Sequence, residues 1–214
     1  MIQSFKSAGT EDIFNGRRTQ AVRRTCPQSL WKIAIRKLDQ LDSVTALPEL
    51  QIPPGNRLEA LKGDPPGTTQ YAYQRPIPPR FSLDGHRTSR GGNGGLPLSE
   101  PKRGDSRVSV RIPTHRVPTH PGEMLFEEFL RPMGLTQREL AKALHVPYQR
   151  INALVKGRRG VTPSTALRLA KYFGMSADFW MNLQLRWDLY HAQQSEAKEL
   201  AVIQPHPASA HAVG

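Results

Sequence analysis

The sequence has few of the residues that cross-link small proteins or build metal centres. It contains a single cysteine, Cys26, so no disulfide can form within the chain, and we expect this thiol to be buried among apolar side chains. Acidic residues are also scarce, because 18 Asp and Glu stand against 30 Lys and Arg, giving a net charge of +12. This excess favours a polyanionic partner such as nucleic acid, although it indicates no particular fold.

Long apolar runs and a secretory signal are missing as well, so we expect a soluble, cytoplasmic protein without a membrane partner. The sequence has no P-loop, nucleophile elbow or dinucleotide-binding fingerprint. His115, His120 and His145 are scattered and lack an accompanying cysteine pair, which argues against a zinc site. We therefore expect no metal, no cofactor and no catalytic residue.

Residues 135–157 carry the clearest local pattern in the chain. Thr136 precedes a helical run and Glu139 follows three residues later, which is the capping box that begins a helix. After a two-residue break, Pro147 suits the first turn of a second helix, where its missing amide hydrogen is not needed. The pattern predicts two short helices joined by a tight turn, a helix-turn-helix.

The second helix of this pair leaves polar side chains on the face opposite its apolar residues. Such a face can read base edges in a major groove, because Arg bonds to guanine and Gln or Asn to adenine. Basic residues follow at Lys156, Arg158 and Arg159. The alternative is an ordinary amphipathic helix pair with a solvated face, but the capping box, the proline break and the basic tail favour DNA binding. The residues of the polar face are Tyr148, Gln149, Arg150 and Asn152.

The flanking sequence predicts helices that would complete a five-helix bundle. A first helix over 122–131 has apolar residues at 124, 125 and 129, and we interpret Glu123, Glu127 and Glu128 as its solvated face. Later helices begin at Thr162-Pro163 and at Ser176, the last one running to about Gln194. That last helix is rich in aromatic residues, which close the core, and any excess suits a dimer contact.

Residues 111–194 resemble the HigA antitoxins of the XRE (lambda-repressor-like) helix-turn-helix family. The matching motifs are H-P-G-E-M-L (120–125), L-T-Q-R-E-L-A-K-A-L (135–144), R-I-N-A-L-V-K-G-R-R-G (150–160), T-A-L-R-L-A (165–170) and D-F-W-M-N-L-Q (178–184). The resemblance implies a homodimer that binds double-stranded DNA at the operator of its own operon and neutralises a HigB-type toxin. It also implies that Gln137 holds a phosphate, that the four polar residues at 148, 149, 150 and 152 face the bases, and that the basic residues at 156, 158 and 159 meet the DNA backbone.

The sequence pattern of residues 1–64 predicts a small and incomplete α/β unit. We expect a short strand and turn near Ile2 and Phe5, one helix over 27–41 with Lys32, Arg36 and Lys37 on its outer side, and irregular chain over 47–61. One helix and one strand bury too little surface to be stable alone. The motifs I-Q-S-F-K, F-N-G-R-R-T and P-P-G-N-R-L-E-A-L-K-G-D resemble the front half of a HigB toxin, a RelE-type ribonuclease.

Residues 65–107 show neither a strand nor a helix period, and their composition is that of a disordered linker. Back-translated with suitable codons and shifted by one base, residues 72–79 and 94–99 permit the toxin-like motifs R-I-N-D-Q-F-R and V-D-Y-H followed by a stop. The hypothesis is that a frameshift near Asp64 fused the remnant of a toxin gene to the gene that follows it.

The sequence therefore predicts a mainly α protein: a five-helix lambda-repressor-like DNA-binding domain (108–196), preceded by the α/β fragment (1–64) and the linker (65–107), and followed by a flexible tail (197–214). The predicted function is that of a sequence-specific transcriptional repressor and antitoxin. Two alternatives stay open. One is a RelE-type, ribosome-dependent mRNA endonuclease fused to its own antitoxin, and the other is a toxin-neutralising module that no longer contacts DNA.

Overall fold

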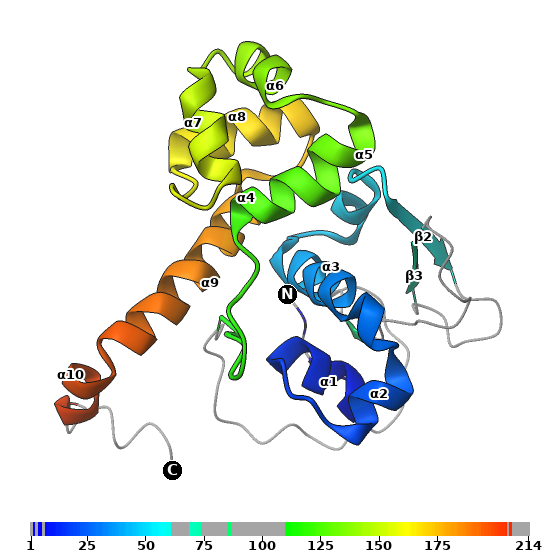
Figure 1. Cartoon of the computed structure of the whole chain (residues 1–214), viewed down its shortest axis with the longest axis vertical. Coiled ribbons are helices and arrows are strands. Elements are labelled where there is room, and N and C mark those ends of the chain that lie inside the picture. The colour runs from blue at the N-terminus through cyan, green and yellow to red at the C-terminus, as the bar shows by residue number, and fades with distance from the viewer. Residues whose placement is uncertain are drawn as a thin grey trace, which may run out of the picture.

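The computed structural model describes residues 2, 4–5, 7–60, 69–73, 85–86, 110–204 and 206. The described chain is mainly helical, which confirms the predicted fold class (Figure 1). In chain order its elements are β1 (Ser4–Phe5), α1 (Ala8–Asn15), α2 (Gln20–Thr25), η1 (Gln28–Leu30), α3 (Trp31–Ser43), η2 (Leu47–Gln51), β2 (Asn56–Ala60), β3 (Thr69–Tyr73), β4 (Gly85–His86), α4 (Pro121–Met124), the π-helical turn η3 (Leu125–Leu130), α5 (Arg131–Met133), α6 (Gln137–Ala143), α7 (Tyr148–Val155), α8 (Pro163–Phe173), α9 (Ala177–Ser195) and α10 (Ala197–Val202).

The helices of the second half begin where the sequence places its caps. The Thr136 hydroxyl accepts the amide of Glu139 at 3.2 Å, and the Glu139 carboxylate accepts the amide of Thr136 at 2.8 Å, which confirms the capping box. Thr162 caps α8 and Ser176 caps α9 in the same way. Each cap satisfies amides that would otherwise lack a partner in the first turn.

The helices α4 to α9 enclose one apolar core, which we call the bundle core. Phe129 of η3 lies at its centre, fully buried, with its ring 5.1 Å from that of Trp180 and 6.3 Å from that of Phe179. The aromatic residues at the start of α9 therefore close the bundle, as the sequence predicts. Among the described residues, no helix is long and apolar enough to cross a membrane.

The first 60 residues contain more helix than the sequence predicts. Besides α3, the structure has α1, α2 and a turn of 3-10 helix over 47–51, and it forms a strand over 56–60 where we expected irregular chain. These helices surround a small core that includes Phe14, Val22 and Cys26. Cys26 is fully buried, as expected, and burial raises the pKa of its thiol to about 11.

Two short antiparallel pairs join distant parts of the first half. Asn56 of β2 lies opposite Tyr73 of β3, and β1 pairs with β4. Because β3 and β4 fall within 65–107, the structure differs from the predicted linker at these residues; the rest of that segment lies outside the described residues. Residues 197–202 form α10, which corrects the prediction of a flexible tail beginning at 197.

The helix α3 lies between the N-terminal core and the bundle, and this position overturns two predictions about charge. Arg36 and Lys37, expected on the outer side, are only 6% and 4% exposed. Glu128, expected on a solvated face, is 3% exposed. These charges are buried together: Arg36 Nε donates to Glu128 Oε1 at 3.0 Å, and Lys37 donates to Glu128 Oε2. Each charge offsets the cost of burying the opposite one.

Candidate nucleic-acid interface

The helices α6 and α7 are held at a fixed angle by a tight turn and by the bundle core. His145 takes the left-handed conformation in this turn, with φ at +52°. The amide of Val146 donates to the Ala141 carbonyl at 3.0 Å, and Arg168 of α8 donates to the Leu144 carbonyl at 2.7 Å. Ile151 of α7 is fully buried. The outer face of α7 is therefore presented in one orientation.

The structure places all eight predicted DNA-contacting residues on α6, on α7 or just after α7. None of them lies in the bundle core, and α6 and α7 lie at the end of the molecule far from α1 and α2 (Figure 1). Three of the eight side chains are half-buried, namely Gln137, Arg150 and Asn152. The other five are exposed: Tyr148, Gln149, Lys156, Arg158 and Arg159.

Three of these side chains form one hydrogen-bonded group across the two helices. Asn152 Nδ2 donates to Gln137 Oε1 at 3.0 Å and to the Tyr148 hydroxyl at 3.2 Å. Arg138, which the sequence analysis did not select, lies with its guanidinium carbon 5.4 Å from the centre of the Tyr148 ring. Its only signal in the sequence was its position beside Gln137 in the first turn of a helix. These contacts orient polar groups of both helices before any ligand binds.

The surface formed by residues 135–160 carries an uncompensated positive charge. Its cations are Arg138, Lys142, Arg150, Lys156, Arg158 and Arg159. Within the described part of the chain, none of these six forms an ion pair. The sole carboxylate of the stretch, Glu139, is taken up by the cap, where the hydroxyl and then the amide of Thr136 lower its pKa below the ordinary value. Such a surface attracts phosphate groups.

The far end of α7 rests on the first turn of α4. A Cβ atom added to Gly122 would lie 1.8 Å from the Leu154 carbonyl oxygen, so only glycine permits this approach of the two backbones. His120 caps α4 by accepting the Gly122 amide at Nδ1 over 2.9 Å. Burial lowers the pKa of His120 below its ordinary value, although Asp188 opposes this shift. The neutral imidazole that accepts this hydrogen bond is therefore favoured.

We predict that Gly157→Ala destabilises the end of α7. Gly157 has φ at +67°, a left-handed conformation that costs an alanine roughly 1 kcal/mol. The expected result is a lower midpoint of urea unfolding, measured by circular dichroism. Gly157→Asn is the matched control, because asparagine tolerates this conformation and should keep most of the stability. Equal losses for Ala and Asn would show that space, and not backbone conformation, requires the glycine.

In the described residues, no group of three or more His, Cys, Asp and Glu side chains is placed to hold a metal ion.

The profile of the helix-turn-helix family HTH_3 matches residues 126–180, a stretch that includes α6, α7 and α8. The chain is 54% identical to virulence-associated protein I of Dichelobacter nodosus over 77 residues, which cover 36% of this chain and 71% of that protein. It is 42% identical to the antitoxin HigA-1 of Vibrio cholerae over 89 residues, 40% of this chain and 83% of that protein.

Solved structures with similar sequences include the Pseudomonas aeruginosa antitoxin HigA with the higBA promoter. That chain is 40% identical, and the match covers 41% of this chain and 97% of that one, with a TM-score of 0.40. A HigA-family addiction module antidote protein from Coxiella burnetii is 39% identical, with coverages of 42% and 100% and a TM-score of 0.41.

Proposed function

Because the chain belongs to the XRE-type helix-turn-helix family, which includes the antitoxin HigA-1 of Vibrio cholerae, we propose that it is a transcriptional repressor and antitoxin that binds the operator of its own operon. The observation that carries this proposal is the outer face of α6 and α7. It combines the oriented amide groups of Gln137 and Asn152 with six cations that have no carboxylate partner among the described residues.

The proposed roles follow from position on the two helices. Tyr148, Gln149, Arg150 and Asn152 occupy α7 and reach base edges in the major groove. Gln137 begins α6 and holds a phosphate, and the residues at 156, 158 and 159 meet the backbone beyond the end of α7. We infer a homodimer, because paired recognition helices read half-sites about one helical turn apart, roughly 34–36 Å. The proposed protein partner is a HigB-type toxin, and the place of action is the cytoplasm.

We also propose that the chain has four segments and that the first of them originates from a toxin gene. Residues 108–196 form the DNA-binding domain, residues 1–64 are the remnant of a HigB-type toxin, residues 65–107 link the two, and residues 197–214 follow the DNA-binding domain. The motifs quoted above support the toxin origin. We propose no enzymatic activity, since the reported relatives are an antitoxin and a virulence-associated protein. Sequencing the locus tests the origin: if no one-base shift restores a toxin-like frame, the frameshift hypothesis fails.

A salt titration tests DNA binding directly. We expect the full chain to bind the DNA upstream of its gene with an affinity that falls steeply between roughly 50 and 200 mM salt. Arg158→Ala should reduce the slope of log affinity against log salt by about one unit, because one phosphate contact is lost. Lys198→Ala on α10 is the matched control and should leave the slope unchanged. A slope near zero, or equal effects of the two substitutions, would contradict the proposal.

A further inference from the structure

The helix α3 lies against the bundle on the side away from α6 and α7 (Figure 1), and polar side chains of the bundle form a second surface that contacts it there. We call this surface the docking face and define it by Arg116 before α4, Glu128 of η3, Ser176 at the N-cap of α9, and Asn182 and Arg186 of α9. Glu128 and Arg186 are 3% and 2% exposed, yet neither lies in the aromatic core. Both are covered by α3 and the turn that follows it, which belong to the first 60 residues of the same chain.

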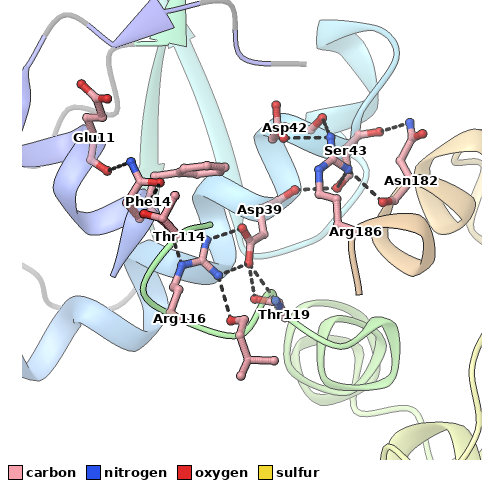
Figure 2. A network of polar contacts seen from close by, with 12 residues as sticks. Glu11, Phe14, Asp39, Asp42, Ser43, Thr114, Arg116, Thr119, Asn182 and Arg186 are labelled. Carbon is pink, nitrogen blue, oxygen red and sulfur yellow. Dashed lines mark hydrogen bonds and ion pairs between the residues drawn. The ribbon is translucent and has the colours of Figure 1, made fainter. Parts of the chain in front are cut away.

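Arg186 and Asn182 bind the end of α3 (Figure 2). The Arg186 guanidinium lies 2.8 Å from the Asp42 carboxylate, donates to the Asp42 carbonyl at 2.7 Å and donates to the Ser43 hydroxyl at 3.1 Å. Asn182 Nδ2 donates to the Ser43 carbonyl at 3.0 Å. Four contacts of matching polarity thus hold the last turn of α3 on α9.

The other contacts lie earlier in α3 and in η2 after it. The Glu128 carboxylate accepts hydrogen bonds from Arg36 and Lys37, which lie one turn or more before Asp42. The amide of Ser176 donates to the Glu49 carboxylate at 3.1 Å. Apolar residues accompany them, because Val44 and Leu50 are fully buried in one cluster with the bundle core.

The segment before α4 also binds α3, at a residue between Arg36 and Asp42. Arg116 reaches the two oxygens of Asp39 at 2.9 and 2.5 Å, and the amide of Thr119 donates to the same carboxylate at 2.9 Å (Figure 2). Opposite charges are therefore matched at 36/37, at 39 and at 42. Charge-matched polar contacts that surround a few shared apolar residues have the character of an interface between two proteins.

We propose that the docking face is a protein-binding surface, that residues 31–51 occupy it as an intramolecular ligand, and that the chain thereby excludes a separate protein from it. The excluded partner is a small protein that presents a helix with two adjacent cations followed by aspartates three and six residues after the first. The proposal rests on the antitoxin role proposed above only for the identity of that partner, a toxin. Residues 31–51 outcompete the separate protein because a tethered ligand acts at a high effective concentration.

The test uses full-length chains and a fluorescent synthetic peptide of residues 28–52 as the probe. In one chain, Arg36→Glu and Lys37→Glu disable the intramolecular ligand, because three carboxylates then meet at Glu128, while the docking face itself is unchanged. We expect this double variant to bind the peptide at least about tenfold more tightly than the natural chain does, measured by fluorescence anisotropy. Lys32→Glu is the matched control on α3, because Lys32 is exposed and its substitution should leave the face occupied.

A charge swap tests that the peptide binds this face and no other. Adding Glu128→Lys to the double variant restores opposite charges within the chain and removes the attraction for the natural peptide. We expect peptide binding to fall back to the level of the natural chain. Near-ultraviolet circular dichroism from Trp180 reports whether the bundle stays folded, and a variant that loses this signal is replaced by Arg36→Gln with Lys37→Gln, which removes attraction without adding repulsion.

Two results would overturn the proposal: equal binding of the peptide to the natural chain and the double variant, or no binding to a folded double variant. Operator binding is measured in parallel on the same chains. Because the docking face lies away from α7, we expect all of them to bind DNA with unchanged affinity. A natural chain that does not bind its operator would count against the proposed function, while the peptide result would still decide the occupation of the docking face.

Discussion

Replacing Glu128 by alanine is expected to lower the free energy of unfolding by about 3–5 kcal/mol, the cost of breaking a buried ion pair from one side. Arg36 and Lys37 would then be two neighbouring cations, 6% and 4% exposed, without the carboxylate that both of them contact. The measurement is urea unfolding at neutral pH, followed by circular dichroism. Hydrogen exchange should show the loss of protection first in α3, whose contacts with η3 are the ones removed.

The deficit of this variant should shrink as the pH is raised. Burial lowers the pKa of Lys37 below its ordinary value of 10.5, and Glu128 opposes this shift in the natural chain. Without Glu128 the pKa falls further, so the unfolded chain binds more protons than the folded chain up to pH 10.5. Stability rises with pH in such a window, and the variant should therefore recover part of its loss between neutral pH and that value.

Glu127→Ala provides the matched control on the same helical segment. Glu127 is 25% exposed and pairs with the exposed Arg131 at 3.1 Å. It also lies 3.7 Å from the Arg36 guanidinium, but Arg36 keeps Glu123 and Glu128 when Glu127 is removed, so we expect a loss of about 1 kcal/mol or less. We expect a clear difference between the two substitutions. Equal losses would mean that Glu128 is no more buried than its neighbour, and that α3 does not cover it in solution.

Arg150→Ala is expected to weaken operator binding by about 1–3 kcal/mol, which is roughly 5- to 150-fold in affinity. Arg150 lies in the first turn of α7, half-buried, and no described residue forms an ion pair with it. Its guanidinium can therefore bond to a guanine without breaking a contact in the protein. Anisotropy titrations at one fixed salt concentration measure the loss.

The same substitution should barely change binding to random DNA, because base contacts give specificity and phosphate contacts give general affinity. Arg24→Ala is the matched control, since Arg24 is an exposed arginine of α2 in the N-terminal unit. An Arg150→Ala chain that keeps full operator affinity would show that the assignment of α7 as the recognition helix is wrong. Equal loss on operator and random DNA would instead place Arg150 on a phosphate.

The sequence by itself determined where three helices of the second half begin and where α7 ends. Thr136, Thr162 and Ser176 cap their helices as predicted, and Gly157 takes the left-handed conformation after α7. These features depend on contacts within four residues along the chain, so a local pattern contains all the information that they need. The apolar period that buries Ile151 and Leu154 is local in the same sense.

Only the tertiary structure decided which charges are buried and which polar groups meet. Glu128 lies three and four residues after Leu125 and Met124, a spacing that puts it on their buried face, but a lone carboxylate there looks too costly to bury. Its partner Arg36 stands 92 residues away in the sequence, and no local pattern reports that distance. The same holds for Arg138 over Tyr148 and for the bond from Asn152 to Gln137, since each joins side chains from two different helices. The physical reason is that burial of a charge depends on its partner, and the fold alone brings the partner to it.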